Sequence, residues 1–233
     1  GLAISSITGN KGSVAGDYAL SATSKTVAGV ITAKALTMSG LSVASSRAYD
    51  GTTGATVIGT AALQTAQSTG TGTTSDGKPY TGDTVSITGT AVGTYDSAHV
   101  ADASSVTFSG LSLTGTQSGN YSLTIQSAAS ATITAATLTP TITNTGVTKV
   151  YDGGMSSGIT PTYSFSGLVS GDTAAVLTNT GIAYNSKDVA DATTVTVSGL
   201  AISSITGNKG SVAGDYALSA TSKTVAGVIT AKA

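Results

Sequence analysis

The sequence predicts a mostly all-β protein made of small, repeated modules. Three observations carry this prediction: segments that alternate apolar and hydroxyl residues, Gly with Asp or Asn between them, and long stretches that recur. Alternation with a period of two puts apolar side chains on one face of a strand and hydroxyls on the other. No window has the long helical period rich in Leu, Glu and Lys that predicts an α-helix, although residues 55–67 are also compatible with a short one.

The alternating segments give the expected strands in chain order. Thr and Val dominate them, and branching at Cβ suits a pleated strand better than a helix. The clearest of these segments are residues 84–88, 106–109, 121–125 and 194–197. With 2 Phe and no Trp, the chain has few large aromatic side chains, so we expect thin, aliphatic cores.

The composition indicates a folded protein with an unusually uncharged surface. Of 233 residues, 43 are Thr, 33 are Ser and 30 are Gly, whereas 9% are charged; typical soluble domains have about 25% charged residues. Disorder requires low hydrophobicity and high net charge, but 39% of the residues are hydrophobic and the net charge is -1. Lys and Arg number 10 against 11 acidic residues, all Asp, which argues against a nucleic-acid partner.

The chain contains no Cys, so it has neither a disulfide framework nor thiolate metal ligands. Chains without Cys are common among exported bacterial surface proteins. No run of 18 apolar residues occurs, so we expect no membrane insertion. No basic, apolar leader begins the chain, and Gly1-Leu2-Ala3 is interpreted as the interior of a longer protein.

Two kinds of internal repeat organise the chain. Residues 1–35 recur without a change at residues 199–233. A second, diverged repeat aligns over ordered anchors: Tyr49-Asp50-Gly51 with Tyr151-Asp152-Gly153, Gly82-Asp83-Thr84 with Gly171-Asp172-Thr173, and Gly119-Asn120-Tyr121 with Gly214-Asp215-Tyr216. We predict the C-terminal part of a preceding repeat at 1–35, a first complete module at 36–135 and a second at 136–233. Residues 1–35 should pack on the following module, stay partly disordered or pair with another molecule through an unpaired edge.

These anchors resemble those of a known family. Lys149-Val150-Tyr151-Asp152-Gly153, Gly171-Asp172-Thr173, Gly214-Asp215-Tyr216 and the closing Gly227-Val228-Ile229-Thr230-Ala231 are similar to the YDG repeat and its relative, the MBG (mostly beta-grasp) domain. The resemblance implies β-grasp-like or sandwich-like modules arranged end to end as an elongated rod. It also implies a place in large secreted bacterial proteins, including filamentous-haemagglutinin-like exoproteins and biofilm adhesins. A continuous β-solenoid is the alternative fold, but its repeats of about 20–29 residues are not seen.

The aspartates of the anchors are predicted to form turns rather than to bind ligands. An Asp before Gly accepts backbone N–H bonds while the Gly takes a positive φ. Asp50 and Asp152 precede Gly in this way, and the same turn-forming role is predicted for Asp83 and Asp172, which follow Gly. The neighbouring Tyr is expected to cover the edge of the core and keep its hydroxyl wet.

The sequence predicts no catalytic residue and no enzyme. A hydrolase of the triad type needs a nucleophile, a base and an orienting group, and the only His is His99. Its counterpart in the second repeat is Asp188, so we expect His99 to be an exposed loop residue. Residues 72–78 match the spacing of a phosphate loop, but Pro79 stands where Ser or Thr should hold Mg²⁺.

No cofactor or metal site is predicted, and calcium is the open alternative. Asp96, Asp102 and Asp188 lie in recurring Asp-containing segments whose oxygens suit a hard cation. No EF-hand pattern is present, however, and acidic residues are sparse. An isopeptide crosslink through Lys149 and Asp188, and glycosylation at the sequon of Asn120, are weaker hypotheses.

The leading functional hypothesis is a mechanical spacer of a secreted or cell-surface bacterial adhesin. Serial copies extend a stalk, and the stability of such an array is roughly additive. Its partners are then the neighbouring repeats of the same chain. The first alternative is a module that binds glycans or a matrix polysaccharide through its Thr and Ser faces or through the inserted loop at residues 70–80. The second is self-association between identical repeats.

Overall fold

The computed structural model describes residues 1–233 and contains strands and three short 3-10 turns, but no α-helix. The prediction of a mostly all-β protein is therefore confirmed. The 3-10 turns are η1 (Ala15–Asp17), η2 (Ser118–Asn120) and η3 (Ala213–Asp215). No helix is long and apolar enough to cross a membrane.

The strands fall into two groups that pair only within themselves. We call residues 34–134 the first unit and residues 136–230 the second unit. The strands of the first unit are β1 (Lys34–Val43), β2 (Ser46–Ala48), β3 (Gly54–Ala55), β4 (Val57–Leu63), β5 (Ser86–Tyr95), β6 (Ser105–Thr114), β7 (Tyr121–Thr124), β8 (Ala129–Ser130) and β9 (Thr132–Thr134). The strands of the second unit are β10 (Ala136–Ile142), β11 (Val147–Val150), β12 (Tyr163–Ser166), β13 (Asp172–Thr178), β14 (Gly181–Tyr184), β15 (Thr194–Ser198), β16 (Ala201–Gly207), β17 (Tyr216–Leu218) and β18 (Ser222–Thr230).

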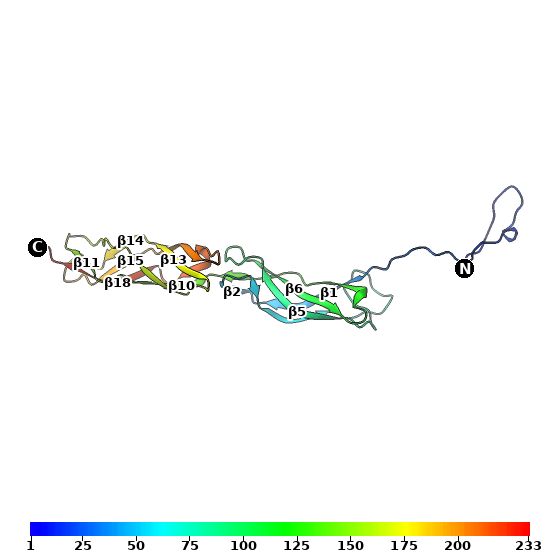
Figure 1. The fold of residues 1–233 in the computed structure, drawn as a ribbon, viewed down its shortest axis with the longest axis horizontal. Coiled ribbons are helices and arrows are strands. Elements are labelled where there is room, and N and C mark those ends of the chain that lie inside the picture. Colours follow the sequence, from blue (N-terminus) through cyan, green and yellow to red (C-terminus); the bar gives the residue numbers. More distant parts are fainter.

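Both units use the same pairing scheme. The opening strand lies antiparallel to one neighbour and parallel to another, giving the orders β4-β1-β7 and β12-β10-β17. A parallel pair, β2-β9 in the first unit and β11-β18 in the second, lies at the end of each unit that is farther from the N-terminus of the chain (Figure 1). The remaining sheet of the first unit is β3-β5-β6-β8. In the second unit the strands that correspond to β5 and β6 are each divided in two. They form the pair β13-β16 and the pair β14-β15, which is part of the sheet β11-β18-β15-β14. The second unit is thus a diverged copy of the first.

The short helix considered for residues 55–67 is wrong, because this segment forms β3 and β4. It contains a β-branched Val-Ile pair followed by Gly59, which disfavours a helix. Gly59 has φ 87° and faces Gly40, φ 99°, at a bulge between β1 and β4. A Cβ at either position would run into a backbone oxygen of the opposite strand, so only glycine fits both sides.

The cores are thin, as the scarcity of large aromatics predicted. Only 28 of the 233 residues are buried. One cluster, Met38, Leu41 and Phe108, lies inside the first unit. A second cluster, Val147, Tyr184, Ala192, Val195 and Ile229, lies inside the second unit. Each unit therefore buries little apolar surface on its own.

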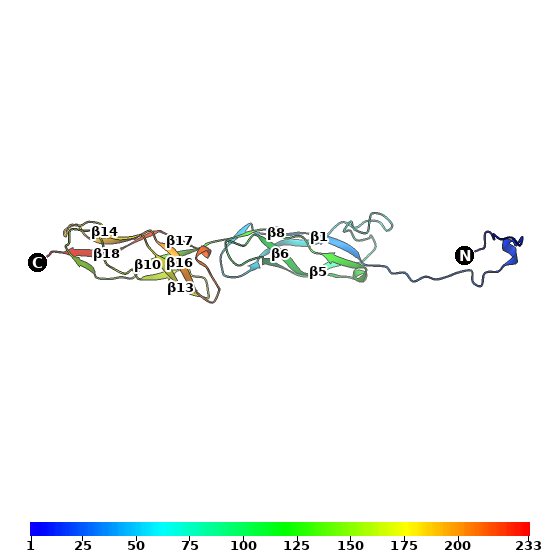
Figure 2. The ribbon, with the colours of Figure 1, turned by 90° about the horizontal axis from the view of Figure 1, so that it is seen from above.

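Residues 1–33 form no strand, and all but their last few residues lie apart from the first unit in both views (Figures 1 and 2). Their apolar side chains are exposed: Val27 is 92% and Ile31 is 100% accessible. The copy of the same sequence at 199–231 forms β16, η3, β17 and β18.

Candidate functional site

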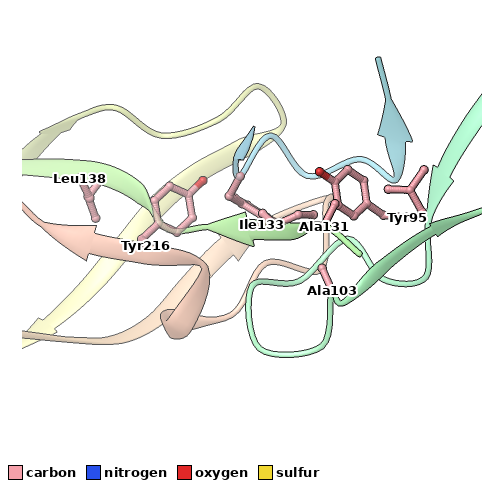
Figure 3. Close-up of a cluster of buried hydrophobic side chains, with 8 residues drawn as sticks. Tyr95, Ala103, Ala131, Ile133, Leu138 and Tyr216 are labelled. Carbon is pink, nitrogen blue, oxygen red and sulfur yellow. The ribbon is translucent and has the colours of Figure 1, made fainter. Parts of the chain in front are cut away.

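The largest buried cluster lies between the two units. Six of its members belong to the first unit and two to the second: Tyr49, Tyr95, Ala103, Val106, Ala131 and Ile133, with Leu138 and Tyr216. Figure 3 shows Ile133, on the segment that leads into the second unit, between the side chains of the two sides. We call this region the junction. Most of these side chains are covered within their own unit, because their counterparts at the uncovered ends are equally buried: Tyr184, Ala192, Val195, Ile229, Leu36 and Tyr121. Tyr49 is the exception: it is 3% accessible, whereas its counterpart Tyr151 is 36% accessible, so the second unit covers it.

Two tyrosines meet edge to face at the centre of the junction. The rings of Tyr49 and Tyr216 have centroids 5.6 Å apart and planes at 70°, a preferred geometry for aromatic pairs. Tyr49 follows β2, and its backbone N–H donates to the carbonyl of Thr134 at 2.8 Å, which fixes it beside the linking segment. Burial raises the pKa of the Tyr49 hydroxyl.

A chain of hydrogen bonds continues from Tyr49 into the second unit. The Ser211 hydroxyl donates to Asp172 Oδ2 at 2.6 Å. Because its single hydrogen is used there, Ser211 accepts from the Tyr49 hydroxyl, whose oxygen lies 2.6 Å away. Tyr216 also donates to Asp172 Oδ2, at 2.6 Å, and accepts from the Val169 N–H at 3.0 Å. Burial and the bond to Asp172 raise the pKa of Tyr216 to about 12.

Asp215 ties the junction together from its other side. It ends η3 and is completely buried. Its carboxylate accepts from the Val212 N–H at 2.9 Å within its own turn, and from the Val100 N–H at 3.0 Å across the junction. His99 Nδ1 lies 2.8 Å from Oδ2. Burial alone raises the pKa of Asp215, but the two N–H groups and His99 outweigh it and hold the pKa below its usual value.

The prediction for His99 is wrong: the side chain is only 32% exposed and binds the neighbouring unit. Sequence comparison misplaced it because the second unit has Asp188 at the matching position. The available signal was that two positions differ between the repeats together, His99 with Asp188 and Asp215 with Asn120. This paired difference can be interpreted only once it is known which end of the first unit contacts which end of the second.

All four anchor aspartates lie at turns, as predicted, but only two of them accept a backbone N–H of the turn with the carboxylate. Asp50 Oδ1 accepts from the Thr52 N–H and Asp152 Oδ1 from the Gly154 N–H, both at 2.9 Å. The glycines that follow these aspartates have φ of 73° and 80°. Asp83 and Asp172 close their turns through the backbone, where their N–H groups donate to the carbonyls of Tyr80 at 3.2 Å and Val169 at 3.0 Å. Their carboxylates accept tyrosine hydroxyls instead of turn N–H groups, those of Tyr121 at 2.5 Å and Tyr216 at 2.6 Å.

A basic side chain repeats beside each of the two turns. Arg47 lies 5.0 Å from the Tyr95 ring centroid and pairs with Asp50. Lys149 lies 5.6 Å from the Tyr184 centroid and pairs with Asp152. Lys149 Nζ is held by Asp152 and two backbone carbonyls. The isopeptide hypothesis would need Lys149 to contact Asp188, and no such contact is present.

Of the aspartates considered for calcium, Asp96 has its carboxylate engaged in loop contacts. Asp96 accepts from the N–H groups of Ser104 and Ser105. In the second unit Asn185 accepts from Thr193 and Thr194 in the same way. A neutral amide thus replaces the carboxylate without changing the loop. No group of three or more His, Cys, Asp or Glu is arranged to hold a metal ion.

The loop that resembled a phosphate-binding motif closes on its own aspartate. Asp76 accepts from the N–H groups of Thr73 and Lys78, at 2.9 and 3.0 Å, and from the Gln67 amide at 2.7 Å. It also pairs with Lys34 at 2.8 Å. The Lys34 bond and these donors lower the pKa of Asp76 far below its ordinary value. The amides of the loop are therefore already occupied by a carboxylate.

Comparison with known proteins bears on the family resemblance. The model of the YDG domain family matches this chain twice, over residues 32–131 and 134–224. The two matches fall on the two units and cover most of the chain. Searches of curated proteins and of solved structures find no match.

Proposed function

The chain belongs to the YDG domain family, and on that premise we propose that it is a spacer in the stalk of a large bacterial cell-surface or secreted adhesin. Its task is to extend a binding region from the cell for attachment or biofilm formation. The units form an elongated rod with β-grasp-like or sandwich-like modules end to end. The partners of each unit are the units before and after it.

The junction is the observation that carries this proposal. A flexible tether leaves its modules free to rotate, so the facing ends need no specific contacts. Here Asp215 is buried and bonded across the boundary to Val100 and His99, while Tyr49 reaches Ser211. A buried carboxylate is costly unless its bonds are kept, so bending at this boundary is resisted. A stalk that holds a binding region at a distance needs this property.

We also propose that the chain is not an enzyme. A His–Asp pair is part of many catalytic sites, but it requires a nucleophile at the other ring nitrogen. The Nδ1 of His99 lies against Asp215, but no hydroxyl is hydrogen-bonded to its Nε2; the hydroxyl of the nearby Ser97 accepts the backbone N–H of His99 instead. The pair therefore serves cohesion between units in this proposal.

Small-angle X-ray scattering on the chain tests the proposal. A compact globule of this length has a radius of gyration of about 17 Å. We expect a clearly larger value and a rod-like distance distribution, the same in calcium and in chelator. The matched control is Tyr49→Ala, which has the same length and the same residues 1–33 but a weakened junction; it should show a broader distribution.

A radius near 17 Å would contradict the spacer and favour one compact binding domain. A rod that becomes flexible in chelator would make calcium the stiffening agent. Binding to a glycan array that is lost on deletion of residues 68–79 would favour the matrix-binding alternative over the spacer.

A further inference from the structure

The far end of the second unit repeats the framework that docks in the junction. His99 and Asp188 occupy the same loop: each backbone N–H donates to a serine hydroxyl two residues earlier, at 3.1 Å in both. Each carbonyl accepts from the alanine four residues later, at 3.0 and 2.9 Å. Yet at this end Tyr151 is 36% and Val189 is 42% accessible. This end of the second unit therefore has the same backbone framework as the end of the first unit at the junction, but no other unit covers it.

The near end of the first unit repeats the other half of the junction. Asn120 ends η2 as Asp215 ends η3. Tyr121 donates to Asp83 and accepts from the Tyr80 N–H, as Tyr216 does with Asp172 and Val169. A cavity of about 320 Å³ opens here; the residues lining it include Ile31, Lys34, Tyr80, Asp83, Asn120 and Tyr121. This end also has the docking framework without an occupant.

The two uncovered ends differ from the junction in one matched pair of positions. In the junction an imidazole faces a buried carboxylate at 2.8 Å. We call a unit built like residues 34–134 the first type and a unit built like residues 136–230 the second type. The uncovered end of a second-type unit carries Asp188. It would bring two carboxylates together if the next unit had Asp at the position of Asp215. Like charges without water between them are strongly unfavourable. Lys187, 3.6 Å from Asp188, is more than half exposed and screens this repulsion little.

We propose that this pair of positions selects which unit docks on which. An end with His99 accepts a unit with Asp, and an end with Asp188 accepts a unit with Asn, as at Asn120, whose amide donates a hydrogen bond to the carboxylate. The occupant of the second unit's free end is therefore a further unit of the first type. This inference rests on the spacer function, because the same docking builds the stalk.

The order of the sequence agrees with this pairing. Residues 1–35 have the sequence of residues 199–233, which end a second-type unit, and they directly precede the first unit with its Asn120. In an array that alternates the two types, an end with Asp188 meets a unit with Asn at the position of Asn120. Two second-type units in succession would juxtapose carboxylates.

A double-mutant cycle at the junction of the full chain tests the selection. His99→Asp recreates the excluded Asp–Asp pair, and Asp215→Asn creates a His–Asn pair. The double variant His99→Asp/Asp215→Asn recreates the pair proposed for the second unit's free end. We expect both single variants to lower the midpoint of urea unfolding. The double variant should lie above His99→Asp, with a coupling of about tenfold in the unfolding equilibrium constant.

Asp188→His is the matched control, since no carboxylate faces it in this chain; its midpoint should equal that of the unaltered protein. A double variant whose losses simply add, or one that fails to fold, would overturn the selection while leaving the scattering test of the spacer untouched. If His99→Asp alone fails to fold and the double variant folds, the selection is supported. Loss of the rod in scattering with intact coupling would instead reject the spacer.

Discussion

Two regions with the same sequence have different structures in this chain. Residues 199–231 form β16, η3, β17 and β18, whereas residues 1–33 form only η1. Both turns have the same N-cap dihedrals, φ -112° and ψ 164°, and in both the Asp side chain accepts the N–H three residues earlier at 2.9 Å. Yet Tyr216 is 5% accessible and Tyr18 is 53%. The local sequence therefore determines the turn, and the partner strands determine the burial.

The partners that make the difference come from elsewhere in the second unit. β16 pairs with β13, β17 with β10, and β18 with β11 and β15. The first unit adds Tyr49, His99 and Val100 at the junction. Each residue of 199–231 consequently has a control of identical local sequence in 1–33.

The largest effect is expected from Tyr216→Ala. The substitution removes a buried ring from the junction, leaves the Val169 N–H without its acceptor and leaves Asp172 with Ser211 alone of its two hydroxyl donors. We expect the free energy of unfolding to fall by about 3–5 kcal/mol, measured by urea denaturation. Tyr18→Ala should change it by less than about 0.5 kcal/mol. Similar losses in both variants would show that the tyrosine acts through local sequence.

The next effect is a loss of stability in alkali. The folded pKa of Tyr216 is raised to about 12, above the value of about 10 in the unfolded chain. The protonated Tyr216 hydroxyl therefore contributes fully to the free energy of unfolding below pH 10. This contribution, up to about 3 kcal/mol, is lost as the pH rises toward 12. Unfolding measured at pH 9 and pH 11.5 tests this. Tyr216→Phe should have a smaller alkaline loss; an unchanged loss would assign it to other tyrosines.

A somewhat smaller effect is expected from Asp215→Ala. It leaves the N–H groups of Val100 and Val212 and the ring of His99 without their acceptor. We expect a loss of about 2–3 kcal/mol in urea denaturation. Asp17→Ala, which removes only the exposed bond from Val14, should cost less than about 1 kcal/mol. Equal costs would mean that the contacts across the junction contribute nothing.

The smallest effect is expected from Ser211→Ala. The hydroxyl relays one hydrogen bond from Tyr49 to Asp172, and its removal should cost about 1 kcal/mol. Ser13→Ala is the control and should have no measurable effect. Thermal unfolding followed by circular dichroism distinguishes the two variants; a neutral Ser211→Ala would remove this relay from the account of the junction.

The sequence predicted the fold class and most of its strands because alternation is a local property. Residues 194–197 and 121–125 were expected as strands and correspond to β15 and β7. Residues 55–67 were ambiguous because the bulge of Gly40 and Gly59 depends on a partner strand. The turns of Asp50 and Asp152 were predictable, since the bond spans two residues.

The junction was not predictable by the same reasoning. His99 and Asp215 are 116 residues apart in sequence, and Tyr49 and Ser211 are 162 apart. Alternation tells which face of a strand is buried, but not which end of one unit meets which end of the next. Alignment of the repeats even obscured the role of His99, because it compares like ends and never facing ones.

The central claim is that the junction holds the two units in one fixed relation, and a distance measurement tests it most directly. The chain has no Cys, so Ser112→Cys on β6 and Ser204→Cys on β16, both exposed, allow one spin label on each unit. Pulsed electron paramagnetic resonance should give a single narrow distance distribution, which broadens in the Tyr216→Ala background. A broad distribution in the otherwise unaltered chain would contradict the claim.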